Sequence, residues 1–246
     1  HFIPVCMINI YLKYLFLLLS LILGSSLSLN AEAAHTMLDG VGAFSKGRFE
    51  IISDIEVSGL KIRHVRSWGL QTCSENSQHY DFIEMSGPIN PDTPYIIEKL
   101  LLRIAEHPNK CTSEDGVKKS TNVILNSGGG FMKDGYKLGE ILRDYQATTY
   151  LGFSAECYSS CATAFLGGFY RRMGPKSILM FHAPYRYQSR YDIVCSSNSQ
   201  DLKEYMQKML NSDDGAYLYD RTMSYCSQSS GWSLNKDAAD IFGLLR

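Results

Sequence analysis

Three short segments of the chain carry residue types that suit acyl transfer. In the first, an apolar strand pattern runs into a polar turn with glycines at 128–130. In the second, small residues around Ser159 precede an apolar run, and in the third a strand pattern ends at His182. Attack on a carbonyl needs a hydroxyl nucleophile, a base within hydrogen-bond reach and donors for the developing oxyanion. The three segments therefore predict a serine hydrolase.

The local geometry expected at each segment fits its role. The first N–H groups of a helix are unpaired and point outward, so a strand-to-helix turn at Ser159 suits a nucleophile. Glycine lacks a Cβ, and residues 128–130 can therefore bring their N–H groups close to a neighbouring group. His182 ends its strand beside a proline that cannot continue the ladder.

Each residue also has a purely structural interpretation. Serine is a preferred N-cap, and capping the helix predicted at residues 162–166 is, on the sequence alone, the commoner reason for Ser159. The glycines 128–130 could form a tight turn or a phosphate cradle, although the Lys-Ser/Thr ending of a P-loop is absent. A lone histidine such as His182 more often serves the structure. These alternatives stay open at the level of single residues.

Strand and helix patterns alternate around these segments, and this alternation predicts a layered α/β fold built on βαβ crossovers. The strands are expected at residues 49–52, 55–57, 60–62, 80–85, 122–125, 147–153 and 177–181. The helices are expected at residues 91–104, 134–145, 162–166, 201–210 and 235–242. The polar stretches 107–120 and 185–199 predict surface excursions.

The N-terminus has the pattern of a secretory signal. Lys13 precedes an apolar run at 14–23, and an A-x-A site follows at 31–33. The run is shorter than the roughly 20 residues that span a bilayer. Residues 8–29 together are long enough, however, so a retained membrane anchor remains the alternative to cleavage.

We therefore expect residues 1–34 to be a signal peptide and residues 35–246 to form one α/β domain. Met7 is the expected start, which makes residues 1–6 an upstream extension. The chain of 246 residues is 45% hydrophobic and 20% charged, with a formal net charge of -1. This composition is typical of a globular protein, and the near-neutral balance argues against a nucleic-acid partner.

Six cysteines follow the signal, and an even number in an exported chain favours disulfides. Six cysteines allow fifteen pairings, so spacing alone does not fix the connectivity. We favour Cys73–Cys111 and Cys195–Cys226, because each pair flanks a polar, loop-like insertion.

The remaining pair, Cys157 and Cys161, is harder to place. Residues four apart on a helix have Cβ atoms about 5–6 Å apart, whereas a disulfide needs about 3.8 Å. A bond would require a non-helical elbow, and we therefore interpret the two residues as buried thiols. No second Cys/His pair has ligand spacing, so we expect no metal.

The order and spacing of these motifs resemble the Clp-protease-like branch of the ClpP/crotonase superfamily, in particular its predicted secreted or periplasmic members. The resemblance covers residues 80–184 and, weakly, the last dozen. It rests on the strand and turn at 82–89, the N-S-G-G-G turn at 126–130, Gly135, the spacing from Ser159 to Gly168, Pro175, and F-H-A-P at 181–184. It implies a single domain of repeated ββα units.

The resemblance also implies a mechanism. Ser159 would attack a carbonyl while His182 takes its proton, and the N–H groups of Gly129 and Ser160 would hold the oxyanion. The substrate would be a peptide bond, and no cofactor is needed. The resemblance further implies a homo-oligomer, which we expect to assemble through residues 185–210.

One departure from the family pattern concerns the acidic third member of the triad. Counting back from Gly243, its position here is Gly231. Asp214, Asp220 and Asp237 are near in sequence, but none aligns. The third member is therefore unknown. The chain is a dyad enzyme, a triad with a relocated acid, or an inactive relative that binds peptides or partner proteins.

Two other interpretations are weaker. Cys161 would be the nucleophile if the alignment shifted by two residues, but that would place it inside the first helical turn. A crotonase-type acyl-CoA activity would need a basic surface, and Arg171, Arg172 and Lys176 offer only three charges, which we expect on a solvated loop. The sequence thus favours a secreted or periplasmic Clp-like serine hydrolase acting on peptides.

Overall fold

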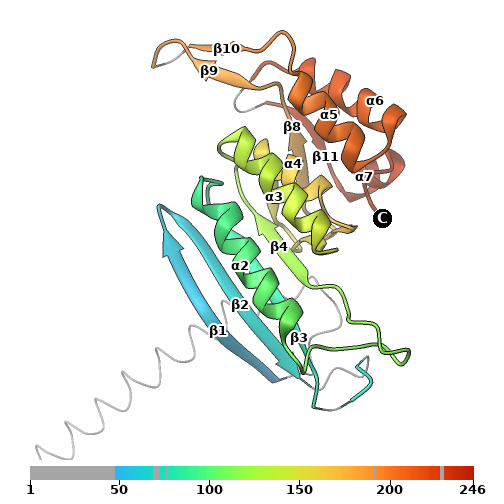
Figure 1. The fold of residues 1–246 in the computed structure, drawn as a ribbon. Helices are drawn as coiled ribbons and strands as arrows, with labels where there is room; N and C mark the ends of the chain where they lie inside the picture. The colour runs from blue at the N-terminus through green and yellow to red at the C-terminus, as the bar shows by residue number, and fades with distance from the viewer. Residues whose placement is uncertain (1–47, 69–72, 76, 191, 228–229) are drawn as a thin grey trace, which may run out of the picture. The chain divides into compact units, whose positions relative to one another are not determined.

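Strands and helices make up the chain from residue 48 to the C-terminus in the computed structural model (Figure 1), which describes residues 48–246 except 69–72, 76, 191 and 228–229. The described strands are β1 Arg48–Val57, β2 Leu60–Trp68, β3 His79–Ser86, β4 Asn122–Asn126, β5 Thr148–Leu151, β6 Glu156–Tyr158, β7 Tyr170–Met173, β8 Ile178–Phe181, β9 Tyr185–Tyr187, β10 Ile193–Cys195 and β11 Trp232–Leu234. The described helices are α2 Asp92–Glu106, α3 Met132–Asp144, α4 Ser160–Leu166, α5 Gln200–Met209, α6 Ser212–Met223 and α7 Lys236–Ile241.

A mixed sheet forms the centre of the fold, with the strand order β1-β2-β3-β4-β5-β7. The hairpin β1–β2 and its neighbour β3 pair antiparallel, and β3, β4, β5 and β7 pair parallel. A second sheet has the order β11-β8-β6, in which β6 and β8 are parallel. Parallel strands are usually buried on both faces, and Val123, Ile124 and Leu125 of β4 are at most 2% exposed. The predicted α/β class is confirmed.

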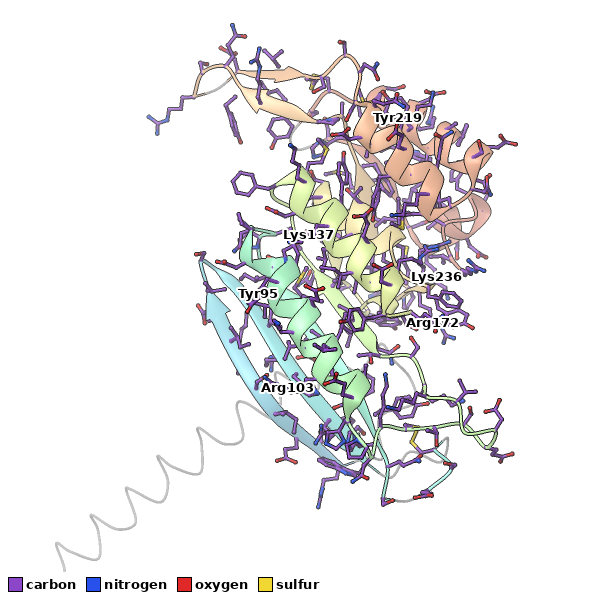
Figure 2. The ribbon with its side chains drawn as sticks, in the orientation of Figure 1. Tyr95, Arg103, Lys137, Arg172, Tyr219 and Lys236 are labelled. Carbon is purple, nitrogen blue, oxygen red and sulfur yellow. A yellow bond between two sulfur atoms is a disulfide. The ribbon has the colours of Figure 1, made fainter. Side chains whose placement is uncertain are left out.

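The helices pack through apolar stripes and through glycines. Along α2, Ile97, Leu100, Leu101 and Ile104 are buried at helical spacing. The opposite face of this helix is exposed, and Figure 2 shows Tyr95 and Arg103 there, with Lys137 on α3. Helices α3 and α4 approach closely because glycines lie between them. A Cβ added at Gly167 would lie 2.1 Å from the carbonyl oxygen of Gly139.

The C-terminal third contains the two predicted helices as α5 and α7, and it adds elements that were not predicted. The stretch 185–199 contains the antiparallel hairpin β9–β10, which pairs Tyr187 with Ile193. Helix α6 follows α5 after a short turn, and Asn211 caps it by accepting hydrogen bonds from Asp213 and Asp214. Together with β11, these elements extend the fold beyond β8.

Three disulfides cross-link the described residues. Cys73–Cys111 and Cys195–Cys226 confirm the predicted pairs, and by loop-closure entropy each contributes about 4 kcal/mol. The interpretation of the other two cysteines as free thiols is wrong, because Cys157–Cys161 is a disulfide. Cys157 lies in β6, so the pair does not have helical i, i+4 geometry. This four-residue loop contributes only about 2 kcal/mol by the same relation.

A buried ionic cluster joins β2 and β3. Oδ1 of Asp81 accepts hydrogen bonds from Nε2 of His64 at 2.7 Å and from Nε of Arg66 at 3.1 Å. Oδ2 lies 2.8 Å from Nδ1 of His79, and the three side chains of Asp81, His64 and His79 are at most 2% exposed. Burial favours a raised pKa for Asp81, but the hydrogen bond from His64 and the charges of His79 and Arg66 hold this pKa below its ordinary value. Burial lowers the pKa of His79 despite the carboxylate, and also that of His107, whose Nδ1 is 3.1 Å from Nε2 of His79.

This cluster predicts a stability that falls in mild acid. The pKa values of His79 and Asp81 are both lowered in the folded state, so the unfolded chain binds more protons than the folded protein does. The stability that this cluster contributes is therefore present at high pH and is lost on acidification. We expect a constant free energy of unfolding above about pH 7 and a decline that begins near pH 6.5, measured by urea denaturation. Asp81→Asn should lower stability by about 3 kcal/mol and deepen the decline below pH 6.5, because it removes the carboxylate that raises the pKa of His79. Equal stability at pH 7 and pH 5 would contradict this account.

No helix among the described residues of 48–246 is long and apolar enough to cross a bilayer. The predicted signal peptide, residues 1–34, and the alternative membrane anchor fall on residues that lie outside the described part.

Candidate active site

The three predicted site segments converge because they follow neighbouring parallel strands. Ser127, just beyond β4, forms a parallel bridge with Cys157 of β6. Tyr158 of β6 is in turn in register with Met180 of β8. The carboxyl ends of parallel strands meet at one edge of a sheet, where α/β proteins bind their ligands. The segment that follows each of these strands therefore reaches the same place.

A cavity of about 750 Å³ opens at this edge. Ser159, Ser160, Gly129 and His182 all line it, so the structure brings together the four residues predicted from the sequence. Most of the remaining wall is apolar, with side chains that include Ile89, Phe131, Met132, Phe181, Leu202 and Met206. Within the part of the chain that the structure describes, no Lys, Arg, Asp or Glu lines the cavity. His182 is therefore the basic group that can accept a proton there.

Ser159 occupies an unusual backbone conformation at the junction of β6 and α4. Its φ is 58° and its ψ is -123°, a combination that costs on the order of 1–3 kcal/mol for a residue with a side chain. Ser159 is at the N-cap position of α4, but its side chain accepts no cap hydrogen bond. The structure thus lacks the interaction that the capping interpretation requires. The hydroxyl is left available for another role.

Hydrogen bonds fix the elbow from both sides. The N–H of Ser159 donates to the carbonyl of Met180 at 2.9 Å, which ties the elbow to the strand that precedes His182. The carbonyl of Ser159 accepts from the N–H and the hydroxyl of Thr163, at 3.1 and 3.0 Å. Thr163 was not predicted as a site residue, although a hydroxyl four residues after Ser159 is a signal of such back-bonding.

The glycine turn lies directly against the elbow. A Cβ added at Gly129 would be 2.6 Å from the carbonyl oxygen of Tyr158 and 2.8 Å from Cβ of Ser159, and φ at Gly129 is +95°. Only glycine allows this approach. The N–H of Gly129 donates to Oγ of Ser127 at 3.0 Å, so the expected oxyanion donor has an internal partner. Ser160 begins α4, where the first N–H groups have no intrahelical partner.

Gly129→Ala is expected to remove catalysis while leaving the fold in place. The added Cβ must push the turn away from Ser159. If the N–H of Gly129 is the oxyanion donor expected from the sequence, its withdrawal costs about 100- to 1,000-fold in kcat. The measurement is the cleavage rate per folded molecule, with folding checked by circular dichroism. Gly128→Ala is the matched control, because a Cβ there meets nothing within 4 Å. Equal rates for the two variants would contradict the assigned position of the turn.

His182 follows β8 and is held by its own backbone. Its Nδ1 lies 2.9 Å from the carbonyl oxygen of Ala183. A carbonyl can only accept, so Nδ1 carries the proton and Nε2 of the neutral ring is free to act as a base. His182 is 8% exposed and its ring lies beside that of Tyr185, with centroids 5.4 Å apart. The contact with Ala183 is invisible to motif analysis, because any residue supplies a carbonyl.

The resemblance assigns the acidic third member to Gly231, which has no room for a side chain. A Cβ added at Gly231 would lie 2.3 Å from the carbonyl oxygen of Phe181, so no side chain fits there. Asp214, Asp220 and Asp237 are exposed on helices, and within the described residues no carboxylate lies within ion-pair distance of the His182 ring. The sequence candidates for a third member are therefore not brought to the site.

The structure also places the residues of two weaker interpretations. Cys161 is in a disulfide and fully buried, so it cannot act as a thiolate nucleophile. The expectation of a solvated basic loop is wrong for Arg171, which lies in β7, is 4% exposed, and donates to the carbonyls of Leu244 and Gly168. Arg172, labelled in Figure 2, is exposed on the same strand.

Comparison with solved structures places the fold. The 1510-N membrane-bound stomatin-specific protease, as a serine-to-alanine variant, superposes with a TM-score of 0.51 at 13% identity, covering 66% of this chain and 75% of that one. The lysine-to-alanine variant of that protease, in complex with a substrate peptide, superposes with a TM-score of 0.50 at 13% identity. The match covers 66% of this chain and 71% of that one. A ClpP1 variant from Listeria monocytogenes superposes with a TM-score of 0.48 at 14% identity, and the match covers 67% of this chain and 88% of that one.

No protein-family model and no curated protein sequence matches the chain. The structural likeness at this level of identity concerns the fold. The mixed sheet with its parallel strands and its helices agrees with it. The chain has a Clp-protease-like fold.

Proposed function

We propose that this protein is a Clp-like serine peptidase with Ser159 as nucleophile and His182 as general base. The observation that carries the proposal is the elbow. Ser159 has a positive φ, makes no cap hydrogen bond, and lines the same cavity as an imidazole whose Nδ1 is already bonded. A serine that served only as a cap would not need this conformation.

The reaction follows from the arrangement of the groups. Nε2 of His182 takes the proton of Ser159 as Oγ attacks the carbonyl carbon of a peptide bond. The oxyanion is held by the N–H of Ser160 and by the N–H of Gly129, which leaves Oγ of Ser127 because a charged oxygen is the stronger acceptor. His182 then donates its proton to the leaving amine. Water attacks the acyl ester by the same route and releases the acid.

The pair works without a carboxylate because the carbonyl of Ala183 fixes the tautomer. In the well-studied triad, the wrong histidine tautomer costs about 10⁴-fold in kcat. The carbonyl supplies that orientation, but it stabilises the imidazolium less than a carboxylate does. We therefore propose a dyad that is slower than a complete triad.

A catalytically inactive protein that binds peptides is the second candidate. It is favoured by the bond from Gly129 to Ser127 and by the absence of an acidic group from the described cavity wall. The test is incubation of the oxidised protein with unfolded casein, followed by mass spectrometry of new N-termini. Cleavage that ceases in Ser159→Ala supports the peptidase. Retained binding of casein fragments with no cleavage by the wild type supports the binding protein.

The disulfides support a location outside the reducing cytosol, in the periplasm or the extracellular medium. We propose export by the N-terminal signal, with the retained anchor as the alternative. We also propose a homo-oligomer that assembles through residues 185–210. Exposed Tyr187 and Val194 on the β9–β10 hairpin provide apolar surface for such a contact.

A further inference from the structure

The Cys157–Cys161 disulfide brackets Ser159 symmetrically, two residues before it and two after it. Cys157 belongs to β6 and Cys161 to the first turn of α4, so the bond spans the junction at which the chain turns. Both cysteines are 0% exposed. A cross-link that closes so short a loop constrains the unfolded chain far less than a long-range bond does. Its main physical effect is therefore local.

The disulfide acts locally on Ser159, whose backbone conformation must be held by its surroundings. A positive φ with a ψ near -123° lies outside both helical wells, and a non-glycine residue stays there only when its surroundings over-determine it. The hydrogen bonds to Met180 and Thr163 act on Ser159 itself. The disulfide adds a covalent limit on how far the strand end and the helix start can separate.

We propose that the Cys157–Cys161 disulfide is a positioning element for the Ser159 nucleophile. With the cross-link removed, the elbow relaxes toward an ordinary negative φ. Oγ of Ser159 then moves away from the cavity that it shares with His182 and Ser160. The activity readout of this inference rests on the proposed peptidase function, whereas its conformational readout does not.

The experiment compares Cys157→Ala/Cys161→Ala with Cys73→Ala/Cys111→Ala, which opens a loop of 38 residues whose cysteines do not line the cavity. For each variant we would measure the melting temperature, the fluorophosphonate labelling kinetics per folded molecule, and hydrogen exchange in residues 156–168. The elbow variant should lose at least about 100-fold in maximal labelling rate at an unchanged half-saturating probe concentration. Its elbow amides should exchange faster, while its melting temperature falls less than that of the control. The control should melt earlier and keep both the labelling rate and the elbow protection.

Unchanged labelling and unchanged exchange in the elbow variant would overturn the proposal, and so would a larger half-saturating concentration at an unchanged maximal rate. If the wild type is not labelled at all, the peptidase function fails, and exchange alone decides the positioning role. Faster elbow exchange would then support it, and unchanged exchange would overturn it. If the alanine variant does not fold, Cys157→Val/Cys161→Ala, which restores buried volume, is measured in the same way.

Discussion

Ser159→Ala is expected to abolish peptide cleavage without unfolding the protein. Removing the nucleophile of a serine peptidase lowers kcat by about 10³-fold or more. Alanine carries the same backbone strain at this φ as serine, and the lost hydroxyl makes no cap hydrogen bond. The free energy of unfolding should therefore change by no more than about 0.5 kcal/mol. Cleavage assays and urea denaturation on the same preparation measure both quantities.

The two readouts separate catalysis from capping. If Ser159 were only an N-cap, its removal would cost about 1 kcal/mol of stability and leave cleavage unaffected. Ser233→Ala is the matched control, since this serine is exposed on β11. It should change neither quantity. Loss of stability without loss of cleavage in Ser159→Ala would contradict the assignment of the nucleophile.

His182→Ala is expected to lower the cleavage rate by about 10³-fold or more, because no other basic group lines the described wall of the cavity. Substrate binding should persist, so the loss should fall on kcat rather than on KM. Added imidazole should restore part of the rate, since the cavity left by the ring can admit it. Steady-state kinetics with and without imidazole measure the effect.

An effect on KM alone would show that His182 only shapes the cavity. His64→Ala is a useful comparison, because that histidine is buried in the ionic cluster with Asp81 and does not line the cavity. It should lower stability and leave kcat per folded molecule unchanged. The pair of variants thus distinguishes a base from a structural histidine.

The parts of the fold that could be predicted from the sequence are those with continuous apolar runs. The strands β4 and β8 are buried runs of this kind, and the residues after them, up to the glycine turn and His182, could be placed at one sheet edge. The strand β6 could not, because its three residues include an exposed glutamate and a cysteine. Since β6 is a strand, the expectation of two free thiols at the elbow failed with it.

Other features leave no apolar pattern in the sequence. Strand β7 contains two arginines, and the buried Arg171 donates from its guanidinium to the backbone carbonyls of Leu166, Gly168 and the distant Leu244. Helix α6 carries a glycine and a polar first turn, although Asn211 before it is an N-cap signal that could have been used. The orientation of His182 by the carbonyl of Ala183 has no sequence signature.

The most direct test of the account is to react the oxidised wild-type protein with a fluorophosphonate and map the adduct by mass spectrometry. A fluorophosphonate modifies serine efficiently only where a base and oxyanion donors activate the hydroxyl. The account predicts one adduct, on Ser159, that is lost when the protein is unfolded before labelling. A folded protein with no adduct, or with its adduct on another residue, would contradict the claim that Ser159 and His182 form a working pair.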